Sequence, residues 1–222
     1  MQLILSGGGS NEKSKGVDSL FTLLLINNRV LYIPIAMNRI KHPYEECLSW
    51  LKNSLSQYGE FEITICNEED LKEITYDDLL SFGGVFIGGG NTYKLLKNFK
   101  DSGFDKKLIR LLKRTDVPVI GGSAGALIFA KSIQTAEPYD SNDFGLDDFL
   151  GMNLVKGMNI WVHYQESMNN LIEEYVNRLG TKIIALPEDS GLYITDEKCI
   201  VVGENRVTIF PGGIEVVRGG NI

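Results

Sequence analysis

The chain has 222 residues, 43% of them hydrophobic, which is enough to bury one sizeable core. Its 22 basic and 29 acidic groups give a net charge of -7, which argues against a nucleic-acid or anionic-membrane surface, because such surfaces need clustered Lys and Arg. No apolar stretch approaches the roughly 20 residues that cross a bilayer. Residues 1–5 contain no basic leader, and Gly7 follows too early for a signal peptide, so we expect a cytoplasmic protein.

The first 130 residues alternate short apolar runs with helix-length amphipathic stretches. The runs are rich in Val, Ile and Phe and too short for buried helices, which predicts strands at residues 3–5, 30–35, 61–66, 85–87 and 117–120. Leu, Ile and aromatic residues recur at three- and four-residue spacing in between, which predicts helices at residues 17–26, 44–58, 91–99 and 104–113. This alternation predicts an α/β fold with a mostly parallel sheet and helices on both faces.

The pattern changes after Ser123. Residues 137–148 combine five carboxylates with Pro, Ser, Asn and Gly, and predict a long acidic loop. A helix is expected at residues 166–179, ended by Gly180. From Lys182 onward, short apolar runs separated by turns predict C-terminal β-hairpins. No repeat or linker divides the chain, so residues 1–222 are expected to form a single domain.

Three cysteines, at positions 47, 66 and 199, are widely spaced and outside any CxxC pattern. This spacing argues against a disulfide framework or a zinc site and favours three reduced, partly buried thiols.

A G-x-S-x-G motif spans residues 121–125, with a predicted strand before it and an apolar stretch at residues 126–130 behind it. This context predicts a nucleophile elbow, in which a sharp strand-to-helix turn exposes the hydroxyl of Ser123 at the end of the sheet. The N–H of Ala124, immediately after the serine, is the natural donor to an oxyanion. The alternative is a structural turn with an incidental serine.

A second glycine turn, GGGNT at residues 88–92, also follows a strand and opens a helix. Its glycines allow close approach of a ligand, so Gly89 or Gly90 is expected to supply a second oxyanion donor. Asn91 or Thr92 is expected to cap the helix, and both are candidates for contact with substrate. A capped turn without a ligand is the alternative. A third turn, SGGGS at residues 6–10, lacks dinucleotide and P-loop spacing and is interpreted as a structural turn at the rim of the site.

A reactive serine needs a base, and the chain contains only two histidines. His42 precedes a proline among polar residues and is expected to face solvent, which leaves His163 as the stronger candidate. The base in turn needs a carboxylate to orient it. The spacing leaves Glu137, Asp140, Asp143 and Glu166 as open alternatives.

Together, GGGNTYKLL at residues 88–96, GSAGA at residues 122–126, and His163 followed by an aromatic residue resemble the peptidase E family of serine peptidases. That family includes alpha-aspartyl dipeptidases and, more distantly, cyanophycinases. The resemblance runs over nearly the whole chain. It implies a flavodoxin-like, or class I glutamine-amidotransferase-like, sheet with serine where the amidotransferases have cysteine.

The resemblance also implies a Ser–His–acid triad. Carried over to this sequence, it assigns Ser123 as nucleophile and His163 as base, with Gly89, Gly90 and Ala124 as oxyanion donors. Aspartyl dipeptidases hold their acid in the stretch Ile-Arg-Thr-Thr-Asn-Asp-Met-Pro, and aligning its proline with Pro138 makes Glu137 the expected acid.

The same alignment puts Gln134 in place of the dipeptidase arginine, and residues 132–148 contain no Lys or Arg. An aspartate side chain on the substrate would need a cation nearby. Arg39, Lys41 and Arg178 are the cations that could reach the site from elsewhere.

These observations predict a serine peptidase that hydrolyses short peptides through Ser123, His163 and Glu137, without a metal or an organic cofactor. The acidic loop is expected to lie over the cleft and exclude large proteins. The alternative is a non-catalytic small-molecule-binding or regulatory protein of the same fold, and an acyl-transferring esterase would share the triad.

Overall fold

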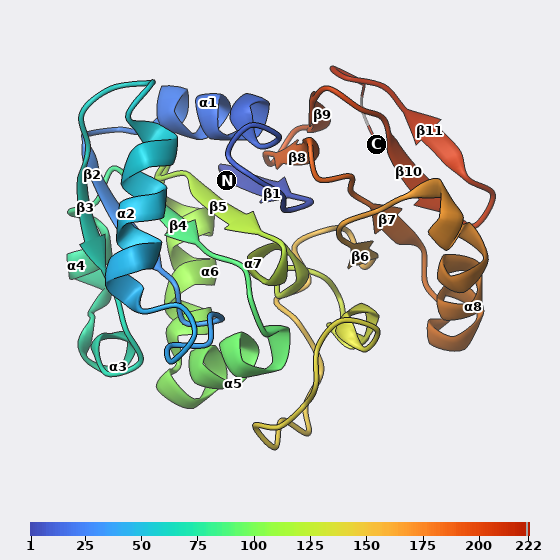
Figure 1. Ribbon diagram of the computed structural model, residues 1–222, viewed down its shortest axis with the longest axis horizontal. Helices are drawn as coiled ribbons and strands as arrows, with labels where there is room; N and C mark the ends of the chain where they lie inside the picture. Colours follow the sequence, from blue (N-terminus) through green and yellow to red (C-terminus); the bar gives the residue numbers. More distant parts are fainter. Residues whose placement is uncertain (221) are drawn as a thin grey trace.

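A computed structural model describes residues 1–220 and 222 (Figure 1). Its main sheet has seven strands in the order β3-β2-β4-β5-β1-β8-β9. The first five of these positions are mutually parallel, β8 pairs antiparallel with β1, and β9 pairs antiparallel with β8. The strands are β1 (Leu3–Ser6), β2 (Arg29–Ile33), β3 (Glu62–Ile65), β4 (Gly84–Ile87), β5 (Val119–Gly122), β8 (Ser190–Ile194) and β9 (Cys199–Gly203). The predicted mostly parallel sheet is confirmed.

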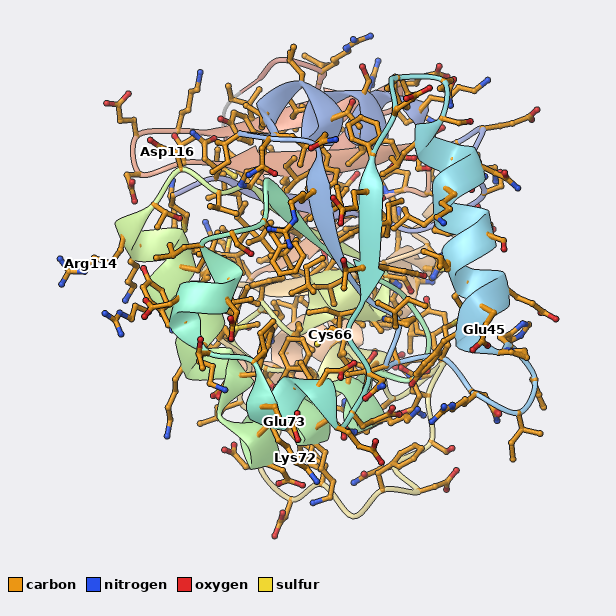
Figure 2. All side chains as sticks on the ribbon, turned by 90° about the vertical axis from the view of Figure 1, so that its left-hand side faces the viewer. Glu45, Cys66, Lys72, Glu73, Arg114 and Asp116 are labelled. Carbon is orange, nitrogen blue, oxygen red and sulfur yellow. The ribbon has the colours of Figure 1, made fainter. Side chains whose placement is uncertain are left out.

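Helices cover both faces of this sheet, and Figure 2 shows α2 and α6 on opposite sides of its β3 edge. One face is covered by α1 (Lys15–Leu24) and α2 (Tyr44–Leu55). The other face is covered by α3 (Asp70–Glu73), α4 (Tyr76–Leu79), α5 (Thr92–Ser102), α6 (Phe104–Arg114) and α7 (Ala124–Leu127). The two short helices α3 and α4 were not predicted, because four residues are too few to show a helical period.

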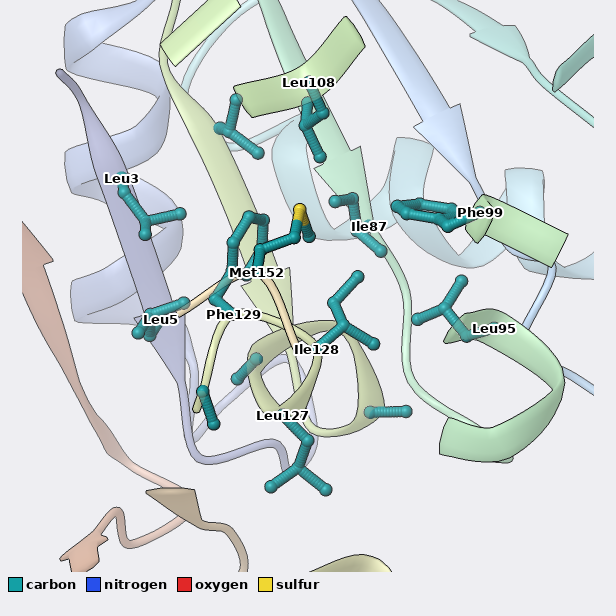
Figure 3. Close-up of a cluster of buried hydrophobic side chains, with 14 of the residues drawn as sticks. Leu3, Leu5, Ile87, Leu95, Phe99, Leu108, Leu127, Ile128, Phe129 and Met152 are labelled. Carbon is teal, nitrogen blue, oxygen red and sulfur yellow. The ribbon is translucent and has the colours of Figure 1, made fainter. Parts of the chain in front are cut away.

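Strand alternation divides the core around the main sheet into two clusters. Ile4, Tyr32, Phe86 and Ile120 are register partners in neighbouring strands and point toward α1 and α2. Their chain neighbours point the opposite way, where Leu5, Ile87 and the side chains of α5 to α7 surround Phe129 and Met152 (Figure 3). The larger cluster anchors the segment that follows β5 and therefore fixes the carboxyl end of that strand.

The C-terminal part contains a second sheet that the sequence did not predict. Its strand order is β11-β10-β7-β6, and α8 (Asn169–Leu179) packs on it through a cluster around Trp161. The strands are β6 (Asn159–Trp161), β7 (Ile183–Ala185), β10 (Val207–Phe210) and β11 (Ile214–Val216). The predicted C-terminal hairpins are present as β8–β9 and β10–β11.

None of the helices formed by the described residues is long and apolar enough to cross a membrane.

Candidate active site

Ser123 occupies the turn between β5 and α7, with φ 52° and ψ -114°, a conformation that L-residues rarely adopt. The flanking glycines are required by close backbone approach: a Cβ on Gly121 would lie 2.2 Å from the carbonyl oxygen of Gly125, and one on Gly125 would lie 2.5 Å from that of Ile87. The helix behind the elbow has only four residues, shorter than the predicted stretch. Free N–H groups at the turn are therefore expected to contribute more to the binding of a negative charge here than the dipole of this short helix.

His163 lies just after β6 and also has a positive φ, 53°. Its backbone N–H donates to the carbonyl of Gly7 at 3.0 Å. A Cβ on Gly8 would lie 2.4 Å from Cε1 of the imidazole, so the glycine turn after β1 packs directly on the ring. Nε2 of His163 lies 2.9 Å from Oγ of Ser123, as expected for a nucleophile and its base.

The carboxylate behind His163 belongs to Glu188, which corrects the expected contact with Glu137. Oε1 of Glu188 lies 3.0 Å from Nδ1 of His163. Glu188 follows β7 at the carboxyl end of the second sheet, and the next strand, β8, pairs with β1. This pairing puts Glu188 beside the turn that holds the histidine.

Glu137 instead accepts hydrogen bonds from Arg178 at 2.5 Å and from the Tyr175 hydroxyl at 3.1 Å. Both partners are on α8, so Glu137 ties the segment after α7 to that helix. Aligning one proline along the chain could not reveal this, because α8 approaches residue 137 only in the folded protein. The alternatives Asp140 and Asp143 bond to Thr92 and Ser141, and no described hydrogen bond joins Glu166 to the histidine.

Lys13 contacts the far side of the Glu188 carboxylate and extends the series of contacts that begins at Ser123 and His163. Its Nζ lies 2.6 Å from Oε2 of Glu188, the oxygen that does not face His163. The hydrogen bond from Lys13, and more weakly that from His163, holds the pKa of the Glu188 carboxyl below its usual value, against the effect of partial burial. The carboxylate is therefore ionised where it faces Nδ1, as an orienting acid must be.

Three backbone N–H groups close to Ser123 are free to bind an oxyanion. Those of Gly89, Gly90 and Ala124 donate to no acceptor among residues 1–220 and 222. Gly89 lies against the serine, since a Cβ added there would be 3.1 Å from Cβ of Ser123. Gly90 has φ 130° and approaches Ala36 too closely for any side chain. The two glycine motifs predicted these groups as oxyanion donors, and that role stays a prediction.

Asn91 and Thr92 use their polar atoms within the protein. Oδ1 of Asn91 caps α5 by accepting from the N–H of Lys94, while its Nδ2 donates to the carbonyl of Ser141. The backbone N–H and hydroxyl of Thr92 both donate to Asp140, at 2.8 and 2.6 Å. Both residues therefore anchor the acidic loop beside the serine, and Thr92 also lines the cavity there.

A cavity of about 710 Å³ opens at Ser123 and His163, a size that suits a small ligand. Tyr139 and Asp140 of the acidic loop form part of its wall, so the loop does lie at the cleft. No Lys or Arg occurs among the described residues that line it. Arg178 is paired with Glu137 and Arg39 stacks over Tyr44, and neither they nor Lys41 line the cavity where an aspartate side chain would need a cation.

Comparison with known proteins places this chain in a family. The profile of peptidase family S51 matches residues 2–202. The chain belongs to peptidase family S51. The expected resemblance to peptidase E and the serine-peptidase class are confirmed at this level.

Relatives in this family match along most of the chain. A probable alpha-aspartyl dipeptidase of Drosophila melanogaster is 24% identical over 95% of this chain and 88% of its own length. Peptidase E of Haemophilus influenzae (strain PittGG) is 27% identical over 77% of this chain and 87% of its own. A crystal structure of a Listeria monocytogenes EGD-e protein assigned as peptidase E superposes with a TM-score of 0.70, at 21% identity, over 90% of this chain and 96% of that one. This superposition supports the fold.

Two residues of this site, Glu188 and Lys13, were not predicted from the sequence. The signal for Glu188 was present, since it follows an apolar strand at residues 183–186 and carboxyl ends of strands collect functional side chains. Lys13 carried no comparable signal, because its position in the loop between β1 and α1 says nothing about Glu188.

Proposed function

We propose that this S51 protein is a serine peptidase, built as one catalytic domain, that hydrolyses short peptides through Ser123, His163 and Glu188. The observation that supports it is the continuous contact from Ser123 Oγ to His163 Nε2, at 2.9 Å, and from His163 Nδ1 to Glu188 Oε1, at 3.0 Å. Each group has a partner suited to its role in acyl transfer.

In the proposed first step, Ser123 Oγ attacks the scissile carbonyl carbon while its proton passes to Nε2 of His163. Ionised Glu188 accepts from Nδ1–H, which selects the tautomer with a free lone pair on Nε2 and stabilises the imidazolium. His163 then gives the proton to the departing amine, and an acyl-serine remains. Water, deprotonated by His163, hydrolyses this ester and restores the enzyme.

The negative charge on the tetrahedral intermediate needs donors at the serine. The free N–H groups of Gly89 or Gly90 and of Ala124 supply them from two different turns. Because these groups are held by the backbone and need no rearrangement, their stabilisation is available as the charge develops.

The deciding experiment is labelling with a fluorophosphonate, which reacts with activated serines. The wild type is expected to be labelled, Ser123→Ala to lose labelling, and Ser19→Ala to keep it, because Ser19 is an exposed serine on α1. An unlabelled but folded wild type would favour the non-catalytic binding protein. Comparing matched ester and amide substrates separates a peptidase from an esterase.

The preference for short peptides rests on the acidic loop, which narrows the cleft at Tyr139 and Asp140 and is tied to α5 through Thr92. We expect dipeptide hydrolysis to be much faster than digestion of casein. Release of casein fragments at a comparable rate would contradict this restriction while leaving the triad intact.

A further inference from the structure

The cavity continues from Ser123 into the space between the sheet and the helices α1 and α2. Its floor is formed by Ile120, Phe86 and Tyr32, one transverse row of register partners. At about 3.3 Å per residue, this row lies roughly 10 Å along β5 from the serine. Gly122 lies between Ile120 and Ser123 and faces the same side of the sheet as Ile120, and a Cβ added to Gly122 would meet nothing within 4 Å. The missing side chain keeps the passage open.

Asp18 of α1 lies at this inner part of the cavity, and its side chain is almost fully buried, at 3% relative exposure. One carboxylate oxygen, Oδ2, accepts from the hydroxyls of Ser14, at 2.7 Å, and Ser54, at 3.1 Å. The other oxygen, Oδ1, forms no hydrogen bond with any other described residue, and it is not among the fully enclosed unpaired atoms. It is therefore open to the cavity.

Nothing in the described chain neutralises this carboxylate. No ion pair includes Asp18, and no Lys or Arg lines the cavity, although Glu46 and Asp140 do. Burial raises the pKa of Asp18, and the two serine hydroxyls offset this only in part. Burying a carboxylate without a cation is costly, and a cation entering the cavity would remove that cost.

The walls between the serine and Asp18 suit an aliphatic stem with a cationic end. Tyr32, Phe86 and Trp50 line this part, with ring centroids 5.7 Å apart for Tyr32–Phe86 and 6.4 Å for Trp50–Phe86. Aromatic rings attract Arg and Lys cations as well as packing against methylene groups. Arginine and lysine are the long side chains that combine both parts.

We propose that this inner cavity is a specificity pocket for a basic side chain, arginine or lysine, on the residue next to the scissile bond, with Asp18 as its charge partner. The proposal rests on the proposed peptidase function for its catalytic readout. A substrate aspartate would meet Asp18, Glu46 and Asp140 without a Lys or Arg to pair with, so the pocket selects against it.

The catalytic test compares arginine with citrulline, which has the same shape without the charge. Two series of dipeptides are compared, one with the variable residue before leucine and one with it after leucine. The variable residue is arginine, citrulline, lysine, norleucine or aspartate. The series that shows a preference reports which side of the scissile bond uses the pocket. In one series kcat/KM for arginine or lysine is expected to exceed that for its neutral counterpart by about 10- to 100-fold. Ratios near one in both series would overturn the proposal.

Asp18→Asn removes the charge with little change in size and is expected to bring the arginine-to-citrulline ratio close to one. Asp77→Asn is the matched control, because it removes an exposed carboxylate on α4 that does not line the cavity. An unchanged ratio in folded Asp18→Asn would overturn the role of Asp18. If that variant does not fold, the comparison of arginine with citrulline substrates on the wild type still tests whether the pocket prefers a positive charge.

A binding measurement separates this proposal from the proposed function. Calorimetry on Ser123→Ala, which cannot form an acyl-enzyme, compares arginine amide with citrulline amide. Tighter binding of arginine amide by at least about 10-fold is expected. Equal binding would overturn the pocket even in an active peptidase. A charge preference in a protein that hydrolyses no peptide would keep the pocket and reject the peptidase.

Discussion

Glu188 Oε1 lies 3.0 Å from Nδ1 of His163, and this contact joins the two sheets of the molecule. His163 follows β6 of the second sheet, whereas Glu188 lies between β7 of that sheet and β8 of the main one. The glycine turn after β1 packs on both residues, since a Cβ on Gly8 would lie 2.4 Å from Cε1 of His163 and one on Gly9 would lie 2.9 Å from Cβ of Glu188. The histidine and its acid are therefore held against one rigid turn close to the serine.

Replacing Glu188 should disable the enzyme, whereas replacing Glu137 should not. Glu188→Gln keeps the size but loses the charge that orients His163, so kcat is expected to fall by about 10²- to 10⁴-fold. Glu137→Gln breaks a half-exposed pair with Arg178, which costs about 1 kcal/mol or less. Kinetics and thermal unfolding of both variants test the assignment. A greater loss of kcat in Glu137→Gln would reverse it.

Gly8 should be essential for activity and not merely for folding. Gly8→Ala puts a Cβ 2.4 Å from His163 Cε1 at φ 98°, so the imidazole must move, and a displacement near 1 Å costs about 10²-fold in rate. Gly103→Ala is the matched control, with φ 67° and nothing within 4 Å of the added atom. Both should lose about 1–2 kcal/mol of stability, but only Gly8→Ala should lose kcat. Equal activities in the two folded variants would contradict this reading.

The turn at Ser123 should be strained in the native enzyme. With φ at 52° and ψ at -114°, a non-glycine residue there costs about 1–3 kcal/mol. Ser123→Gly should therefore unfold at higher urea concentration than Ser123→Ala, although both lack the nucleophile. Equilibrium urea unfolding measures the difference, and a more stable alanine variant would show that the turn is relaxed.

Lys13 should make the stability of the protein depend on pH in the acid range. Its hydrogen bond depresses the Glu188 pKa from the ordinary value of 4.5, so the associated stabilisation is present above about that pH and is lost as pH falls through the native pKa. The stability advantage of wild type over Lys13→Met should thus be larger at pH 7 than at pH 3. Lys15→Met, an exposed lysine nearby on α1, is the control. An advantage that does not change with pH would contradict the pairing.

Local patterns predicted the strands of the main sheet well, but they did not predict β6 or the assembly of a separate second sheet. The apolar runs became β1 to β5 and the amphipathic stretches became α1, α2, α5 and α6, because each carries its own period over enough residues. Strand β6 has three residues, too few for a period, and it is defined by pairing with β7 far along the chain. The helix predicted at residues 166–179 begins with a 3₁₀ turn at Glu166–Met168 and continues as α8.

The sequence by itself pointed to Ser123, His163 and the two glycine turns, and the structure brings Ser123 and His163 into contact. A strained elbow and free N–H groups require glycines at fixed local spacing, and two histidines leave little choice of base. The proposed acid and the proposed specificity pocket depend on the tertiary structure. Glu188 reaches His163 because β8 pairs with β1, and Asp18 is buried because α1 packs beside α2. Twenty-nine carboxylates are nearly equivalent along a chain, and only burial and long-range contact distinguish among them.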